Sequence, residues 1–504
     1  MKKLFLSLEG SLNNHHAAHA ELMARAMAEG HEVYLLSCDA ALLSCRYNFT
    51  HQPVVCARCE ATCQKSADLL ELPATRRLRL DRALFPKYLT DELPVDTDAL
   101  MNFNFEGVNV GRGVASTVIS LTRDHIIEPR GKHRQLIALQ LRNAIGAMRN
   151  YKKMLEEVDP DEVTMFNGRH VHVWPMVELC IQQNRSYITH EKGSLITRVE
   201  TYTNSLPHSI AERHRLLYLL WDEASRQEAV KAADDYFTGR RRGTNADEAV
   251  FTGHQVKGSL PKHFDSEQHN IVIFNSSEDE VKTITEWQTD LYDNQNEAIT
   301  QITNAFKGRQ DVHIYLRIHP NLKSVDNIQT AELREMKQHN LTVIAADAAV
   351  DTYELMEAAN VVVSFGSMTG IESTFWRTAS ITYGRSFYEQ LDATYLPADR
   401  AELIDLLNDK QLPPKPLEGA RKFGYYMSQG GQDHRHVITD EHGRGYVNGV
   451  CIDATPAEQK TFHLRYLKHY PSWVKQHLMM VGAMPRKRDL KKRTPKALYA
   501  KRTY

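Results

Sequence analysis

The segment Asn360–Glu372, with the sequence NVVVSFGSMTGIE, constrains the fold of this chain more than any other. Its first half, Asn360–Ser364, is a β-branched run of the kind that fills a strand buried on both faces of a parallel sheet. Its second half is a turn of small residues that opens an expected helix over Gly370–Trp376. A strand, such a turn and a helix start together present backbone N–H groups and hydroxyls to an anion. The segment therefore predicts a phosphate-binding turn in an α/β domain.

Two further strands of the same expected sheet end in polar residues. Asp311–Lys323, DVHIYLRIHPNLK, is a buried-strand run that ends in Arg317, His319 and Lys323. Asn270–Phe274 is followed by Asn275, Ser276 and Ser277, although helix capping alone would also explain the two serines. Ligands of open α/β sheets bind outside the carboxyl ends of the strands. We therefore expect these strand ends to form one anion site with the turn.

The length of 504 residues is too great for one core and predicts two domains with additions. A βα rhythm begins at Lys2–Leu8 and continues through strands at His31–Ser37, Glu162–Phe166 and Arg185–Thr189, without a G-x-G-x-x-G fingerprint. We predict a first domain over residues 1–240 with an insertion at about 66–130, a second domain over 241–412, and an extension over 413–504. The predicted fold class is α/β with two Rossmann-like domains.

Polar residues also follow two strands of the first domain. Glu162–Phe166 delivers Asn167 and Arg169 into a loop, and Arg185–Thr189 delivers His190 and Glu191. Arg169 is suited to an anionic sugar or phosphate group. His190 or Glu191 is suited to proton transfer at neutral pH. A loop held by its own hydrogen bonds explains the same residues equally well.

Five of the seven cysteines gather early in the chain, at Cys38, Cys45, Cys56, Cys59 and Cys63. The odd total and the uneven spread argue against a secreted disulfide framework. Several thiolates in a short, loop-rich segment could close around zinc or an iron–sulfur cluster, with buried free thiols as the alternative. The four expected ligands are Cys38, Cys45, Cys56 and Cys59.

The net charge of −1 gives the chain no general attraction to nucleic acid. No apolar run approaches the roughly 20 residues that span a bilayer. Met1–Leu8 begins like a signal peptide but meets polar residues at once, so we expect a first strand in a cytoplasmic protein. An apolar set in Tyr470–Met484 precedes a strongly basic end. This pattern predicts peripheral membrane contact at the inner face of the cell membrane, or else a solvated tail.

The order of these motifs resembles GT-B glycosyltransferases, and more narrowly the capsule and surface-polysaccharide branch. The residues that carry the resemblance are FNGR at Phe166–Arg169, HEKG at His190–Gly193, FNSSEDE at Phe274–Glu280, RIHPN at Arg317–Asn321, and DTYELM with SFGSMTGIES within Asp351–Ser373. The His-Pro pair and the Ser/Thr-rich helix start also resemble bacterial sialyl- and Kdo-transferases. There, such motifs hold the phosphate and sugar of a CMP-linked donor.

The resemblance implies a nucleotide-sugar donor held by the second domain. Donor-phosphate contacts would come from His319, Ser367 and Thr369, with Arg317 and Lys323 nearby, and Glu372 is placed like the acid that binds the donor ribose. The donor site would also include Ser364, Gly366, Asn275, Ser276 and Ser277. Catalysis would rest on positioning and on stabilising the departing nucleotide, with no cofactor or metal required for it.

The resemblance places the acceptor, a glycan or a lipid-linked glycan, in the first domain beside Asn167, Arg169 and His190. Candidate bases are then Glu9, His15 or His16, and Glu191, since no acid sits in an unmistakable catalytic motif. Alternatives are a polyol-phosphate transferase of the teichoic-acid type, a sugar-nucleotide epimerase, and a non-catalytic scaffold in a polysaccharide assembly complex.

Overall fold

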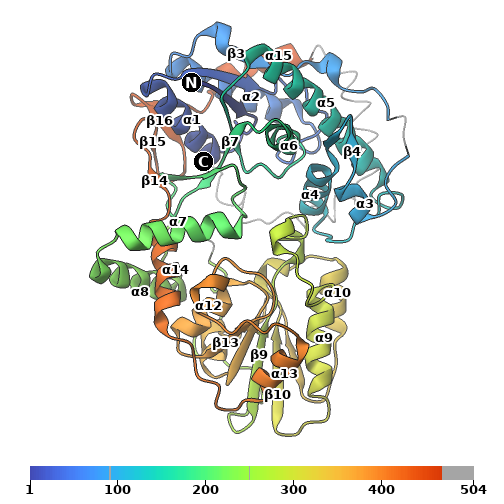
Figure 1. The fold of residues 1–504 in the computed structure, drawn as a ribbon, viewed down its shortest axis with the longest axis vertical. Helices are drawn as coiled ribbons and strands as arrows, with labels where there is room; N and C mark the ends of the chain where they lie inside the picture. The colour runs from blue at the N-terminus through green and yellow to red at the C-terminus, as the bar shows by residue number, and fades with distance from the viewer. Residues whose placement is uncertain (90–91, 249, 468–504) are drawn as a thin grey trace. The chain divides into compact units, whose positions relative to one another are not determined.

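The computed structural model describes residues 1–89, 92–248 and 250–467, which fold into two compact units (Figure 1). The first unit contains Met1–Thr122, Ile126–Pro207 and the described chain from Gly431 onward. The second unit contains Arg123–His125 and His208–Gly430.

The first unit is built on a seven-stranded sheet. Its strand order is β14 (Gln432–Asp433), β8 (Arg198–Thr203), β7 (Ser186–Lys192), β6 (Glu162–Phe166), β1 (Lys2–Ser7), β2 (Glu32–Ser37) and β3 (Arg77–Arg79). The strands from β7 to β3 are parallel, and β8 and β14 are added antiparallel. The parallel part has the doubly wound order of Rossmann folds, and its direction of growth reverses between β1 and β6.

Alternate residues of β1 fill two cores, as expected for a strand buried on both faces. Leu4 and Leu6 pack with α4 (Gly111–Thr122), α5 (Arg134–Val158) and α6 (Trp174–Gln182). Phe5 packs on the opposite face with α1 (Asn13–Ala28) and α2 (Pro53–Leu69). Between α2 and α4 the predicted insertion contains α3 (Thr97–Met101) and a hairpin of β4 (Asn104–Phe105) and β5 (Val108–Asn109).

The second unit repeats this plan with five parallel strands. Their order is β11 (Leu341–Ile344), β10 (Val312–Arg317), β9 (His269–Phe274), β12 (Val361–Ser364) and β13 (Ala379–Thr382), with the reversal between β9 and β12. One face packs against α9 (Gln295–Ala305), α10 (Ile328–Glu335) and α13 (Arg400–Asn408). The other face packs against α11 (Thr352–Glu357). The prediction of an α/β chain with two Rossmann-like domains is confirmed.

The predicted domain boundaries at 240 and 412 are wrong. Two helices before residue 240, α7 (Ile210–Glu223) and α8 (Arg226–Arg242), belong to the second unit, where they share a core with α12 (Met368–Phe375) and α14 (Leu417–Gln429). Extended backbone at Ala224 and Ser225 separates the two helices. The apolar stripe that the helix pair presents to α14 is the physical reason for the different boundary.

The chain after Gly430 returns to the first unit, where it adds β14 to the sheet. It then forms a small antiparallel sheet of β15 (Ile438–Thr439), β16 (Gly445–Val447) and β17 (Val450–Cys451), and the helix α15 (Pro456–Leu467). The buried carboxylate of Glu21 accepts hydrogen bonds from the backbone N–H groups of Arg435, His436 and Val437. This carboxylate fixes the returning segment, which the sequence had placed in a separate extension.

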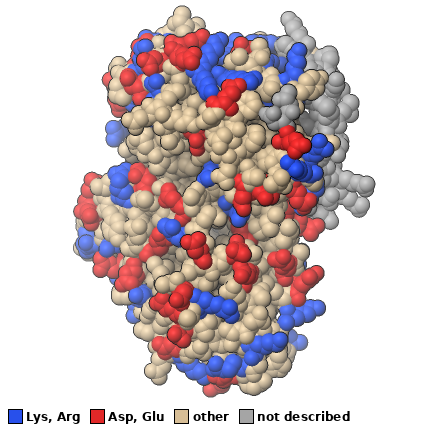
Figure 2. Space-filling view, turned by 45° about the vertical axis from the view of Figure 1, so that its right-hand side comes forward, with Lys and Arg blue, Asp and Glu red and all other residues tan. Residues whose placement is uncertain are grey.

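The predicted membrane-contacting segment lies outside the described residues, since it begins at Tyr470. Within the described chain, no helix combines the length and the apolar character needed to cross a membrane. On the face drawn in Figure 2, lysines and arginines are intermixed with aspartates and glutamates. Such a surface gives the described residues on that face no broad attraction for nucleic acid.

Candidate functional site

Both predicted site regions lie at the carboxyl ends of parallel strands, near the two reversals of strand order. In the first unit, Glu9 follows β1, Asn167 follows β6, and His190 and Glu191 lie in β7. Asn167 and Gly168 have φ angles of 61° and 84°, in the left-handed region. A Cβ atom at Gly168 would lie 2.6 Å from the Leu206 side chain and 2.9 Å from that of Thr189, so only glycine fits there.

Three side chains at this edge form a short polar chain. The Asn167 amide donates to Glu191 Oε1 at 2.6 Å, and Glu191 Oε2 lies 3.8 Å from His15 Nδ1. The side chains of His15 and Glu191 are 23% and 24% exposed, so a substrate can reach them. Burial and the charge of Lys192 lower the pKa of His15 to about 4, so its imidazole is neutral at pH 7. This arrangement is that of a general base whose second ring nitrogen faces a carboxylate.

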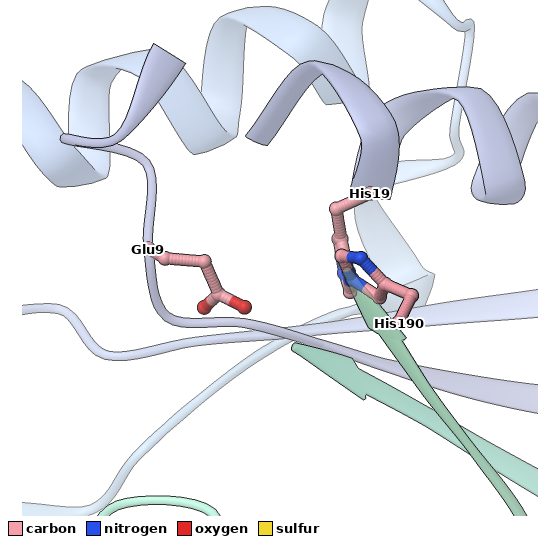
Figure 3. Close-up of side chains that lie close together, drawn as sticks. All are labelled: Glu9, His19 and His190. Atoms are coloured by element: carbon pink, nitrogen blue, oxygen red, sulfur yellow. The ribbon is translucent and has the colours of Figure 1, made fainter. Parts of the chain in front are cut away.

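A second cluster, deeper in the first unit, is made by Glu9, His19 and His190 (Figure 3). All three are buried, and His19 Nδ1 lies 2.9 Å from His190 Nε2. The Leu8 backbone N–H donates to Glu9 Oε2 at 2.7 Å, whereas Oε1 has no hydrogen-bond partner. Burial raises the pKa of Glu9 to about 8, and burial lowers the pKa of both histidines. Because Glu9 is fully buried, accessibility favours His15 with Glu191 over Glu9 as the base.

His16 is paired with a serine and not with the other catalytic candidates, whereas His19, which was not predicted, lies beside Glu9 and His190. His16 is buried, and its Nε2 lies 3.0 Å from Ser66 Oγ on α2. That bond explains His16 as a packing residue, so the prediction of a catalytic His16 is not supported. The sequence analysis missed His19, although its spacing of four residues from His15 places both on one face of a helix. Arg169, predicted to hold an acceptor, is partly buried and directly follows Gly168.

In the second unit, Asn275 and His319 connect the carboxyl ends of β9 and β10. Asn275 Oδ1 accepts the backbone N–H of His319 at 2.8 Å. His319 Nδ1 accepts the backbone N–H of Asn321 at 3.1 Å, which leaves the proton of the neutral ring on Nε2. Burial and Arg123 lower the pKa of His319 to about 4. A neutral imidazole with its Nε2–H fixed in this way is a donor suited to a phosphate oxygen.

Arg317 is the last residue of β10 and one of the largest fully buried side chains in the described structure. Its Nη2 donates to the carbonyl of Ala348 at 3.2 Å, but Nε and Nη1 have no hydrogen-bond partner. Burial lowers the pKa of Arg317 to about 10, which still leaves the guanidinium charged at neutral pH. A buried cation with two unused donors is stabilised when an anionic ligand binds to it.

The predicted strand, turn and helix are present at β12 and α12, but the helix begins at Met368, two residues before the expected Gly370. Gly366 has a φ of 79°, and a Cβ there would lie 2.4 Å from the carbonyl oxygen of Arg385. Ser367 is the N-cap of α12, and its Oγ accepts from the backbone N–H and the hydroxyl of Thr369 at 3.4 and 3.1 Å. Ser364, in contrast, is buried beside the hydroxyls of Thr382 and Tyr388, and its role in donor binding stays a prediction.

Ser276 and Ser277 hold their own loop. Ser276 Oγ donates to the carbonyl of Phe365 and accepts from the side-chain amide of Gln295. Ser277 Oγ donates to Asp279 at 2.6 Å and accepts from Arg123 Nη2 at 2.8 Å. These bonds explain both serines as structural residues, without the helix capping considered from the sequence. Lys323 is exposed after the short turn that follows His319.

Glu372 does not have the environment of a ribose ligand. It is buried, and its Oε1 accepts from Arg240 Nε at 2.6 Å and from the Tyr353 hydroxyl at 3.1 Å. Burial alone would lower the pKa of Arg240, but the charges of Glu372 and Glu248 raise it. The predicted ribose-binding acid is therefore the anion of a structural ion pair within the second unit.

We expect Glu372→Ala to lower the free energy of unfolding by about 1.5–3 kcal/mol, the contribution of a hydrogen bond to a charged group, because Arg240 keeps Glu248 as its remaining partner. Urea unfolding would measure this loss. The matched control is Glu357→Ala, since Glu357 pairs with Arg241 near the surface and should cost at most about 1 kcal/mol. If the Glu372→Ala protein is stable but binds nucleotide more weakly, Glu372 is a ligand of the nucleotide and not a structural residue.

The cysteine segment is helical where the sequence predicted loops. Cys56, Cys59 and Cys63 lie on α2, and Cys45 pairs with Asn48 in an isolated bridge. All are free thiols, and burial raises the pKa of Cys38 and Cys45. Among the described residues, the group that brings three metal-ligating side chains within 4.8 Å is Glu9, His19 and His190. The cysteine sulfurs do not form such a group here, and the zinc or iron–sulfur site stays a prediction.

Comparison with known proteins gives matches among solved structures alone, since no protein-family model and no curated protein matches the chain. The Thermosulfurimonas dismutans KpsC beta Kdo 2,4 transferase is 11% identical with a TM-score of 0.35, and the match covers 60% of this chain and 87% of that chain. The beta Kdo 2,7 transferase of the same KpsC is 12% identical with a TM-score of 0.34, over 64% and 89% of the two chains.

Epimerases also match. The Methanocaldococcus jannaschii UDP-GlcNAc 2-epimerase, in complex with UDP-GlcNAc and UDP, is 11% identical with a TM-score of 0.28, over 84% of this chain and 98% of that chain. At these identities and TM-scores the likeness identifies neither a reaction nor a substrate for this chain.

Proposed function

We propose that this chain is a glycosyltransferase that moves a sugar from a nucleotide-activated donor to a hydroxyl of a surface-polysaccharide acceptor. The observation that carries the proposal is the group of His15 and Glu191, both partly exposed, with the buried Asn167 bonded to Glu191. An acceptor hydroxyl is a weak nucleophile until a base removes its proton. His15, beside the carboxyl ends of the strands, is placed to act as that base.

In the proposed reaction, His15 Nε2 takes the proton of the acceptor hydroxyl as its oxygen bonds to the anomeric carbon of the donor. Glu191 faces Nδ1 and stabilises the imidazolium that forms, while Asn167 holds the carboxylate in place. The bond between the anomeric carbon and the phosphate oxygen breaks, and its electron pair leaves with the nucleotide.

The second unit supplies groups that suit the leaving nucleotide. Arg317 has two unpartnered guanidinium nitrogens, and His319 has a fixed Nε2–H. The turn at Gly366, Ser367 and Thr369 opens the helix α12, whose N-terminus favours negative charge. The proposal includes a cytoplasmic setting at the membrane and a glycan or lipid-linked acceptor.

A nucleotide screen tests the proposal. We expect one of CMP, UDP, GDP or dTDP to raise the Tm of the protein, because a ligand that binds only the folded state stabilises it. His319→Ala should abolish that shift. The control is His313→Ala, since His313 lies on the same strand β10 but bonds to Thr342. Donors carrying the selected nucleotide are then incubated with glycan acceptors, and the products are identified by mass spectrometry.

The products decide between the alternatives. A glycosylated acceptor with free nucleotide supports the proposal, and transfer of a polyol phosphate would identify the teichoic-acid type. An altered sugar nucleotide formed without acceptor would identify an epimerase. If no nucleotide shifts the Tm, the scaffold alternative replaces the proposal.

A further inference from the structure

The buried cluster of Glu9, His19 and His190 is not explained by the proposed transfer reaction. Its members come from three separate elements, namely the loop after β1, the helix α1 and the strand β7 (Figure 3). One ligand-type atom from each lies within 4.8 Å of the other two. All three residues are buried, with exposed fractions of 0% for Glu9, 1% for His19 and 0% for His190.

The hydrogen bonding inside this cluster is incomplete. A single N–H···N bond accounts for the 2.9 Å distance between His19 Nδ1 and His190 Nε2. The other ring nitrogens, His19 Nε2 and His190 Nδ1, have no hydrogen-bond partner, and neither has Glu9 Oε1. A buried polar atom is normally paired, so the unpartnered Glu9 Oε1 beside this pair of rings requires an explanation, and an ion that replaces the N–H···N bond is one of the recognised ones.

We propose that Glu9, His19 and His190 bind a divalent transition-metal ion. Two imidazole nitrogens at 2.9 Å and a carboxylate within 4.8 Å need only small side-chain movements to surround one ion. The ligand set of two imidazoles and one carboxylate suits Zn²⁺, Fe²⁺ or Mn²⁺, whereas Mg²⁺ and Ca²⁺ prefer oxygen ligands. Water would complete the coordination.

The three ligands sit on backbone that is already held in place. A Cβ at Gly10 would lie 2.3 Å from the carbonyl oxygen of Cys59 and 2.7 Å from the Cys63 sulfur, so the loop after β1 lies directly against α2. His19 lies within the helix α1, and His190 pairs with Phe166 and Thr201 in the sheet. The ion would join these elements.

The site is separate from the proposed base but adjacent to it, because His190 directly precedes Glu191. An ion bound to His190 would fix the end of β7 and with it the carboxylate that faces His15. The metal proposal concerns binding and does not depend on sugar transfer.

Metal binding is measured on the full-length protein after treatment with a chelator. We expect the wild-type protein to take up one Zn²⁺ or Co²⁺ per chain by elemental analysis, and to gain Tm on adding the metal. The Co²⁺ spectrum should lack a sulfur-to-metal charge-transfer band. Glu9→Gln, His19→Ala and His190→Ala should each lose the ion and the Tm gain.

Two controls separate this site from other ligands and from misfolding. His16→Ala removes a buried histidine from the same helix, and the double variant Cys38→Ser with Cys59→Ser removes the cysteine alternative, so both should keep the ion. Circular dichroism establishes that each variant is folded. The proposal is overturned if the wild-type protein takes up no ion, if the folded Glu9→Gln and His190→Ala proteins bind it normally, or if the cysteine variant loses it.

Discussion

Replacing His15 with glutamine is expected to lower kcat for sugar transfer by about 10²–10⁴-fold, the usual contribution of a positioned general base. Glutamine fills the same space but cannot take up the proton of the acceptor hydroxyl. The Kd for the nucleotide should not change, because every donor-phosphate candidate belongs to the second unit. Steady-state kinetics with the donor selected by the nucleotide screen would measure the effect.

The neighbouring histidine provides the matched control for this loss. His16→Gln changes the same residue type one position later, but the side-chain amide can still bond to Ser66, so kcat should remain within a few-fold of wild type. Glu191→Gln should lower kcat less than His15→Gln, since Glu191 acts through His15. Full activity of a folded His15→Gln protein would rule out His15 as the base, and Glu191 would then be the exposed candidate.

Replacing Arg317 with methionine is expected to change stability and binding in opposite directions. The ligand-free protein should be more stable by about 1–4 kcal/mol, because an apolar side chain of similar length replaces a buried cation with two unpartnered nitrogens. Nucleotide affinity should fall at least about 100-fold, since charge-assisted hydrogen bonds contribute about 1.5–3 kcal/mol each. Urea unfolding and calorimetric titration would measure the two effects.

An arginine at the other end of the same strand is the control for Arg317. Arg309 precedes β10, is half-exposed and pairs with Asp311, so Arg309→Met should leave nucleotide affinity unchanged. A destabilised ligand-free Arg317→Met protein would show that the bond to Ala348 is structural. Unchanged nucleotide affinity would remove Arg317 from the proposed donor site.

The strands and their polar ends could be predicted because both signals are local. Glu162–Phe166 has the predicted bounds in the structure, since it is a short run with apolar and β-branched residues that ends at the polar Asn167. The carboxyl ends of such strands share one edge of a parallel sheet, which is why Asn275 and His319 could be placed together.

The roles of individual side chains depended on partners that are remote in sequence. Glu372 has the spacing of a ligand on α12, but Arg240 occupies it from a helix assigned to the other domain. Ser364 and His16 have polar side chains whose partners, Tyr388 and Ser66, likewise lie far along the chain. No local pattern reports such pairs.

Two local features of the cysteine segment predict a helix, although the segment was interpreted as rich in loops. Pro53 stands at the first turn of α2, a position where proline is favoured because its missing N–H would be unpaired anyway. The run after it, 54–69, contains three alanines and neither glycine nor a second proline, a composition that favours a helix. A helix over these residues fixes Cys56 and Cys59 three residues apart on one face, and so sets a spacing that a loop would leave open.

The return of the chain to the first unit has a consequence for the order in which the protein folds during synthesis. Domains generally fold as units while the ribosome is still adding residues. Among the described residues, those of the second unit end at Gly430, and at that point the first unit still lacks β14 and the three backbone N–H groups that bind Glu21. Of the described parts, the first unit is therefore completed after the second, and its nascent form leaves the Glu21 carboxylate and a sheet edge unpaired until the segment from Gly431 onward has been synthesised.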